Sequence, residues 1–181
     1  MTLSVRAKPT LYKGIRFRSR LEARWAVFFD ALGIEWTYEP NVDGAPAGYL
    51  PDFDLGHFYF EVKPDNWLPA QVSGRGSTDW NPSHDRDFKR WGTFVASVAP
   101  KILAVGFGEP GTWENGRLIG YATIYAFEEA RATPATWGEC AACGVIRVVR
   151  EGEPVCDCPQ VFTHLQRAYS AVRDESYEDA S

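Results

Sequence analysis

The chain has 181 residues, of which 45% are hydrophobic and 24% charged. This composition is typical of a folded domain, so it excludes a wholly disordered or collagen-like chain, and the length suits one domain with a small appendage. No apolar stretch approaches the roughly 18 residues of a membrane span, and the first residues lack the apolar region of a signal peptide. We therefore expect a cytoplasmic protein without a membrane partner.

The charge is distributed unevenly along the chain. A net charge of −5 argues against a nucleic-acid partner, but seven of the first 24 residues are Lys or Arg and only one is a carboxylate. We predict that this basic segment contacts DNA phosphates, the alternative being a solvated basic face. The predicted contacts are Arg16, Arg18, Arg20 and Arg24. Four carboxylates and no cation lie in the last eight residues, so we expect a flexible acidic tail over 166–181.

A helix is predicted to begin after Ser19 and to end at Gly33. Ser19 is a favourable N-cap, and Gly33 readily adopts the left-handed conformation that ends a helix. The apolar residues between them recur at helical spacing: Leu21, Trp25, Phe28 and Leu32.

Three strands are expected next, over 34–39, 49–55 and 58–63. A two-residue loop at Gly56-His57 would place Leu55 opposite Phe58, and the same register places Asp52 opposite Glu61. The segment 64–82 has no periodicity, so we expect a long loop. Its tryptophans, Trp67 and Trp80, are expected to anchor the loop to the core, the alternative being that they stack on bases.

The rest of the chain predicts a second helix from Ser83 to just before Pro100, followed by strands over 101–107 and 118–127. Residues 128–137 are interpreted as a linker because they contain Pro134, and a short helix is expected over 164–173. This order predicts a mixed sheet with helices packed on it, an α/β class protein of the α+β mixed-sheet kind.

One strand pair carries the residues that predict chemistry. Glu61 and Lys63 share a face of their strand, and the predicted register brings Asp52 to the same face. Two carboxylates facing each other destabilise a sheet unless a cation offsets them, and oxygen ligands suit Mg²⁺ or Mn²⁺. The alternative is a solvent-facing hairpin with an ordinary Glu-Lys pair.

These residues resemble a known family. Pro51-Asp52 followed by Glu61-Val62-Lys63 is similar to the PD-(D/E)xK motif of restriction-endonuclease-like nucleases, and the stretch 17–25 looks like the first helix of a phage and bacterial branch that includes Holliday junction resolvases and transposon-end nucleases. The resemblance covers about residues 12–107. It implies an αβββαβ core in which Asp52, Glu61 and the Val62 carbonyl bind Mg²⁺, while Lys63 assists the attacking water.

Glu22 allows two interpretations. In the resembling branch a helix glutamate joins the metal site, and Glu22 is the matching residue. Ser19-x-x-Glu22 is also a capping box, in which the glutamate bonds to backbone at the start of the helix. The two roles are compatible, and the sequence does not decide between them.

The four cysteines form a C-x₂-C-x₁₂-C-x-C cluster: Cys140, Cys143, Cys156 and Cys158. Four thiolates at this spacing predict a closed, structural Zn²⁺ site, with His164 as a substitute ligand and a redox pair or unligated thiols as alternatives. We therefore expect a nuclease core over 1–131, a linker and four-cysteine zinc module over 132–165, and the acidic tail.

Together these features predict a Mg²⁺-dependent DNA endonuclease with catalytic residues Glu22, Asp52, Glu61 and Lys63. The resemblance suggests a phage or mobile-element enzyme, in the bacterial or phage-infected host cytoplasm, that selects branched or double-stranded DNA. A homodimer or a recruiting protein partner is a further expectation. The alternative is a non-catalytic DNA-binding or assembly protein that retains a nuclease fold and uses its zinc module for interaction.

Overall fold

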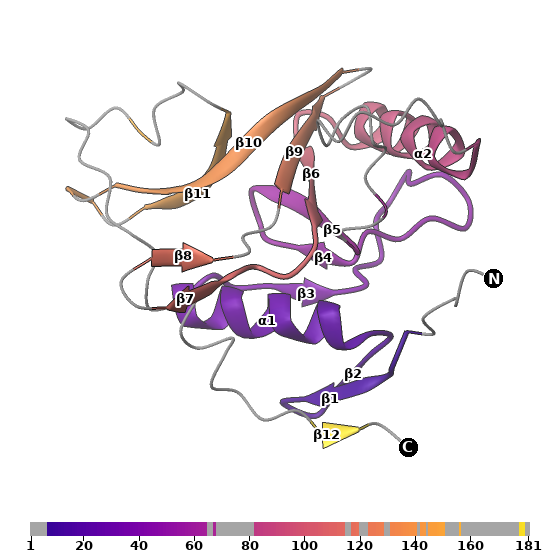
Figure 1. The fold of residues 1–181 in the computed structure, drawn as a ribbon. Coiled ribbons are helices and arrows are strands. Elements are labelled where there is room, and N and C mark those ends of the chain that lie inside the picture. The colour runs from indigo at the N-terminus through magenta and orange to yellow at the C-terminus, as the bar shows by residue number, and fades with distance from the viewer. Residues whose placement is uncertain are drawn as a thin grey trace.

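Two helices cover opposite faces of a central mixed sheet in the computed structural model (Figure 1). The structure describes residues 7–64, 67, 82–114, 117–119, 123–128, 131–140, 142–143, 145–150, 156 and 178–179. The elements are β1 (Thr10–Tyr12), β2 (Ile15–Phe17), α1 (Arg20–Leu32), β3 (Thr37–Tyr38), β4 (Phe53–Asp54), β5 (Phe58–Lys63), α2 (Pro82–Val98), β6 (Ile102–Phe107), β7 (Thr112–Glu114), β8 (Arg117–Ile119), β9 (Thr123–Glu128), β10 (Arg131–Glu139), β11 (Ile146–Arg150) and β12 (Glu178–Asp179).

The central sheet has seven strands in the order β11-β10-β9-β6-β5-β4-β3 within the described residues. Among the described strands, only β5 and β6 pair in parallel, and α2 lies between them in the chain, as a parallel connection requires. The succession α1-β3-β4-β5-α2-β6 has the expected order of one helix, three strands, one helix and one strand. The predicted α+β class with a mixed sheet is confirmed.

Helix α1 has the predicted ends. The Ser19 side chain accepts a hydrogen bond from the Glu22 amide, and Gly33 adopts the left-handed conformation with φ of 71°. The helix packs Trp25, Phe28 and Phe29 against one face of the sheet. The positions of its two ends are therefore local properties of the sequence, set by the caps.

Side chains of β5 alternate, as predicted, between a hydrophobic core under α1 and a second one under α2. Phe60 and Val62 lie in the core under α1, whereas Tyr59 lies in the core under α2. The register is also the predicted one, with Phe53 opposite Phe60. Glu61 therefore leaves the sheet on the α2 side.

Two predicted strands are shorter than expected: β3 covers only Thr37–Tyr38, and β4 covers only Phe53–Asp54. The single strand predicted over 118–127 is two strands, β8 and β9. Within the basic N-terminal segment, residues 10–17 form the β1–β2 hairpin. Lys13 and Gly14 at its turn both have positive φ, the backbone of a two-residue hairpin turn.

The linker predicted over 128–137 is wrong, because these residues contribute to β10 of the central sheet. Trp137 is buried against Phe28 and Phe29, so the core extends beyond the expected boundary at 131. Pro134 is tolerated because β11 pairs with β10 only from Ala135 onward, so the missing amide removes no bond to β11.

The acidic tail was expected to be flexible, but Glu178–Asp179 forms β12 and pairs with β1. The edge of β1 offers unpaired backbone groups, which a short extended segment can satisfy. The helix predicted over 164–173 lies outside the described residues. In the part of the chain that the structure describes, neither helix has the length and apolar character needed to cross a membrane.

Candidate functional site

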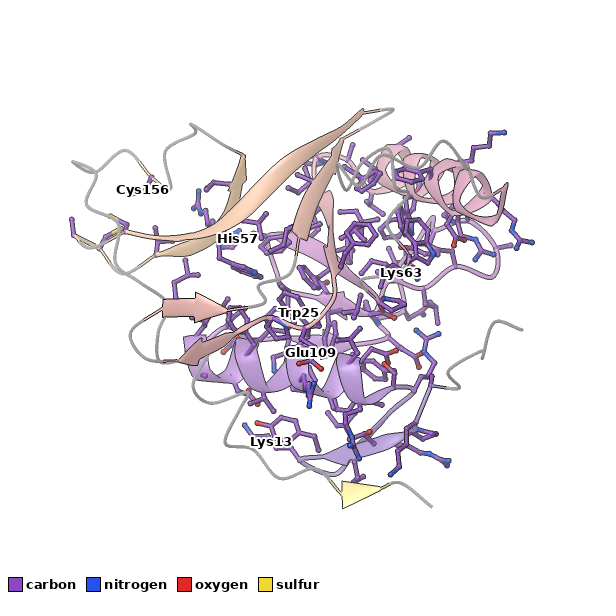
Figure 2. The ribbon with its side chains drawn as sticks, in the orientation of Figure 1. Lys13, Trp25, His57, Lys63, Glu109 and Cys156 are labelled. Atoms are coloured by element: carbon purple, nitrogen blue, oxygen red, sulfur yellow. The ribbon has the colours of Figure 1, made fainter. Side chains whose placement is uncertain are left out.

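The four residues predicted to be catalytic line one cleft of about 480 Å³: Glu22, Asp52, Glu61 and Lys63. The cleft lies where the start of α1, the loop before β4, the end of β5 and α2 meet. Lys63, at the end of β5, lies between α2 and the α1 layer (Figure 2). Residues separated by up to 41 positions therefore converge from α1, the loop before β4 and β5, which carries both Glu61 and Lys63.

Asp52 is buried, and backbone groups hold it in place. Its carbonyl oxygen accepts a hydrogen bond from the Glu39 amide at 2.9 Å, and its Oδ2 accepts one from the Val62 amide at 2.7 Å. The ladder between β4 and β5 ends before Asp52, because its side chain takes the Val62 amide. The Asp52 carboxylate is thus directed at the strand that carries Glu61.

Glu61 has a different hydrogen-bond partner on each of its two carboxylate oxygens. Lys63 Nζ lies 2.5 Å from Oε1, and the Tyr49 hydroxyl donates to Oε2 at 3.0 Å. Tyr49 and Glu61 are both buried, and burial with the nearby Glu61 charge raises the pKa of Tyr49 well above its usual value. The sequence did not identify Tyr49, because the strand predicted over 49–55 places it on the face opposite Asp52. In the structure, Tyr49 lies instead in the loop before β4.

The carboxylates are close enough to oppose each other's ionisation. Burial, followed by the charges of Glu61 and Glu22, raises the pKa of Asp52 well above its usual value. Burial lowers the pKa of Lys63, but the carboxylates of Glu61 and Asp52 more than offset this effect and leave that pKa raised. The cleft therefore gathers buried carboxylates that oppose each other's ionisation and that Arg18 and Lys63 partly neutralise.

Glu22 is held at the start of α1 by bonds to the Arg18 amide and the Ser19 hydroxyl. Its Oε2 accepts from the Arg18 amide at 3.2 Å, and Ser19 Oγ donates to its Oε1 at 2.8 Å. The Tyr38 hydroxyl donates to Oε2 at 2.5 Å. These bonds belong to the start of α1, yet the carboxylate also lines the cleft and acts on Asp52.

The arginines predicted to bind DNA have different surroundings. Arg18 places Nη2 2.5 Å from Asp52 Oδ1 and Nε 2.8 Å from Glu39 Oε1. Arg24 forms an ion pair with Glu109. Arg16 is exposed on β2, and Arg20 is half-buried on α1. Arg18 is therefore the one of these four that lines the cleft.

Helix α2 supplies further residues that sequence analysis missed. Asp87, Arg90 and Trp91 line the cleft beside Lys63. The Arg90 guanidinium lies 5.8 Å from the centre of the Tyr49 ring, and Lys63 Nζ lies 5.8 Å from that of Trp91. These contacts join the α2 side of the cleft to β5 and to the loop before β4.

Trp67 packs on the buried rings of Trp91 and Phe107, with ring centres 5.0 and 5.4 Å away. The interpretation that it anchors the long loop to the core is confirmed. Because the same Trp91 lies beside Lys63, this packing also supports the wall of the cleft.

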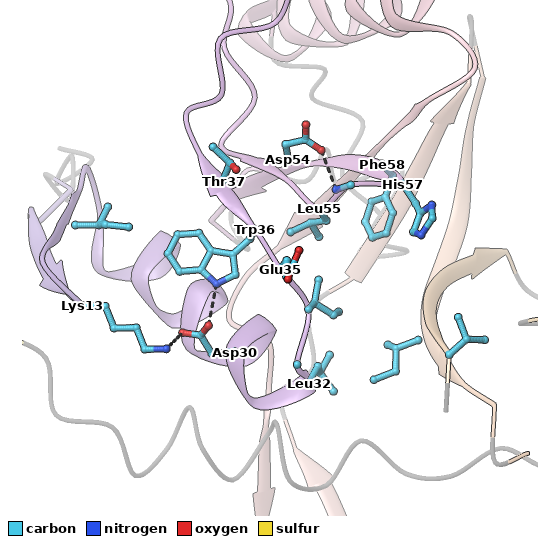
Figure 3. A pocket seen from close by; sticks show the side chains of 16 residues that line it. Lys13, Asp30, Leu32, Glu35, Trp36, Thr37, Asp54, Leu55, His57 and Phe58 are labelled. Carbon is cyan, nitrogen blue, oxygen red and sulfur yellow. Dashed lines mark hydrogen bonds and ion pairs between the residues drawn. The ribbon is translucent and has the colours of Figure 1, made fainter. Parts of the chain in front are cut away.

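A larger groove of about 1190 Å³ lies at the other end of α1 (Figure 3). Asp30 in this groove accepts a hydrogen bond from Trp36 Nε1 at 3.1 Å and pairs with Lys13 Nζ at 2.9 Å. Asp54 Oδ1 accepts from the Gly56 amide at 2.8 Å. Asp30 and Asp54 are thus held separately by different partners, unlike the carboxylates of the smaller cleft.

Three of the four cysteines come together at the β10–β11 turn. The sulfur atoms of Cys140, Cys143 and Cys156 lie within 4.8 Å of one another, close enough to hold one metal ion. The Cys143 amide and the Cys156 side chain lower the pKa of Cys140 to about 7, which favours the thiolate that metals bind. Cys158, the fourth predicted ligand, lies outside the described residues.

Comparison with known proteins found no matching family model, and no curated protein or solved structure similar enough to place the chain.

Proposed function

We propose that this chain is a Mg²⁺-dependent DNA endonuclease of the PD-(D/E)xK type. The observation that supports it best is the convergence of two buried carboxylates, Asp52 and Glu61, with Lys63 in one cleft. Burying like charges together is unfavourable, and the raised pKa of Asp52 reflects this cost. A site that binds a cation during catalysis accounts for such an arrangement.

The donor set fits a hard divalent cation. Asp52 and Glu61 would hold the ion, with Glu22 as a third carboxylate, and these oxygen donors are those that Mg²⁺ and Mn²⁺ prefer. Such an ion stabilises charge on a phosphodiester and lowers the pKa of a bound water. Lys63 retains its proton at neutral pH because its pKa is raised, so it acts as a donor towards substrate phosphate rather than as a base.

A cleavage assay tests this proposal. Wild-type protein is incubated with linear, supercoiled, single-stranded and four-way-junction DNA in Mg²⁺, Mn²⁺ or EDTA. We expect cleavage only with metal and a preference for branched DNA, since the low pI of 5.2 disfavours tight binding to undistorted duplex.

Variants of two cleft residues, compared with variants of two residues outside the cleft, test whether the cleft is the active site. Asp52→Asn and Lys63→Ala should each reduce cleavage by at least about 100-fold, the order of magnitude for a group that stabilises the transition state. Asp54 and Lys101 form a comparable pair, with Lys101 Nζ 2.9 Å from Asp54 Oδ1, yet neither lines the cleft. Asp54→Asn and Lys101→Ala should therefore retain cleavage. Equal cleavage by all four variants would overturn the assignment.

We also propose that the cysteine cluster holds a structural Zn²⁺. Cys140, Cys143 and Cys156 are already gathered, and Cys158 is two residues from Cys156 in the sequence. Four thiolates close a tetrahedral site and leave no position for substrate, so this zinc would stabilise the β10–β11 turn and take no part in hydrolysis.

A further inference from the structure

The exposed charged residues of α2 over 86–98 are basic, in a chain whose net charge is negative. Within 86–98, where the structure describes the side chains of this helix, every exposed charged residue is a cation: Arg86, Lys89 and Arg90. The carboxylate in this range, Asp87, is half-buried and lines the cleft. Since the chain has a net charge of −5, three exposed cations without an exposed carboxylate among them are a local concentration of positive charge.

The three cations form one ridge along the helix. Residues three and four apart lie on the same face, so Lys89 and Arg90 are both neighbours of Arg86. Trp91, Phe94 and Val95 are buried on the sheet side of α2. Helical packing thus turns the cations away from the core, and we name Arg86, Lys89 and Arg90 the α2 ridge.

The α2 ridge continues from the cleft. Arg90 lines the cleft and lies over the Tyr49 ring, whereas Arg86 is one helical turn away, about 6 Å along the axis. Arg18, just before α1, also lines the cleft. Figure 2 shows Lys63 directly below α2, so the α2 ridge continues outward from the predicted catalytic residues.

We propose that the α2 ridge binds the sugar-phosphate backbone of a DNA duplex next to the phosphodiester held in the cleft. The inference rests on the proposed nuclease function and extends it by naming the surface that holds DNA outside the reacting phosphate. Exposed Arg and Lys at helical spacing suit a row of phosphates, and such contacts position a duplex without reading its bases. The ridge therefore adds affinity for any sequence.

The test compares two double variants. Arg86→Ala/Lys89→Ala removes two ridge cations but leaves the cleft-lining Arg90 in place. Lys13→Ala/Arg147→Ala removes two exposed cations elsewhere, from the β1–β2 turn and from β11. Binding to a fluorescent duplex is measured by anisotropy in EDTA across a salt series. Hydrolysis of bis(4-nitrophenyl) phosphate, which is too small to reach the ridge, is measured in Mn²⁺.

We expect the ridge variant to bind duplex at least about 10-fold more weakly near 0.1 M salt, with the salt-dependence slope reduced by about 1.8, that is 0.9 for each lost phosphate contact. Its hydrolysis of the small diester should equal that of wild type. Wild-type affinity and slope in the ridge variant, or an equal loss in the control variant, would overturn the inference. If wild type hydrolyses no diester but the ridge variant still loses affinity, the nuclease proposal fails while the DNA-binding surface stands.

Discussion

The backbone amide of Val62 donates a hydrogen bond to Oδ2 of Asp52 across 2.7 Å. The residues on either side of Val62 are Glu61 and Lys63, so one strand carries two of the four predicted catalytic residues and also holds Asp52 in place. A bond to a rigid strand amide keeps the Asp52 carboxylate in place against the repulsion of Glu61. This bond would preorganise the cleft for the cation that we propose it binds.

The affinity of the cleft for metal should still depend on pH at values above the pH range in which an exposed carboxylate titrates. Because burial and the charges of Glu61 and Glu22 raise the pKa of Asp52, a proton competes with the metal at pH values where an exposed aspartate is ionised. Mn²⁺ affinity, measured by electron paramagnetic resonance between about pH 5 and pH 8, should therefore rise with pH. The dependence should flatten in Asp52→Asn, and a flat profile in wild type would contradict the prediction.

Glu22→Gln separates the capping role from the metal role. Glutamine also serves in a capping box, so this variant should unfold within about 0.5 kcal/mol of wild type. It should bind Mn²⁺ at least about 10-fold more weakly, because a neutral amide is a poorer ligand than a carboxylate. Ser19→Ala should instead lose about 1 kcal/mol of stability, since the Glu22 amide loses its cap. Wild-type Mn²⁺ affinity in Glu22→Gln would contradict the metal role of Glu22 and leave helix capping as its role.

Tyr49→Phe should lower the rate of cleavage. Its hydroxyl holds Glu61 Oε2, and a hydrogen bond to a charged group contributes about 1.5–3 kcal/mol, so we expect kcat to fall about 10-fold or more. The DNA concentration at half-maximal rate should change little, because the ring that packs on Phe94 remains. Tyr59→Phe is the matched control, since Tyr59 also packs on Phe94. Equal losses in both variants would indicate a packing effect.

Gly106→Ala should destabilise the fold. A Cβ atom at this position of β6 would lie 2.6 Å from Phe60 Cζ and 2.9 Å from Trp25 Cζ2, so the α1 core would have to move. Overpacking of this kind costs about 1–3 kcal/mol, measurable by urea unfolding. Phe60→Leu should recover part of the loss when combined with Gly106→Ala. Strict additivity of the two changes would argue against this contact as the cause.

Zinc content should depend on each cysteine. Purified protein should contain about one zinc per chain, and Cys140→Ser or Cys143→Ser should each remove it and lower the melting temperature. Cys158→Ser tests the ligand that only the sequence spacing predicts. Metal analysis without zinc in wild type would contradict the proposal, and full zinc in Cys158→Ser would assign the fourth position to another group.

The sequence alone determined the features that depend on near neighbours in the chain. Ser19 and Gly33 mark the ends of α1 because a cap acts on backbone groups within one turn. The faces of Phe60 and Glu61 follow from the alternation of a strand, and their register with β4 follows from a two-residue loop. These local rules were enough to bring Asp52 and Glu61 together.

Tertiary structure decided what those residues contact. Arg18 pairs with Asp52 across 34 positions, and Tyr49 bonds to Glu61 from a loop without periodicity. Pro134 predicted a linker instead of a strand. Strand β10 nevertheless continues through Pro134, because β11 pairs with β10 only from Ala135 onward. Each of these contacts depends on which distant segments pack together. That packing is determined by burial of the whole core, so it cannot be predicted from a short sequence pattern.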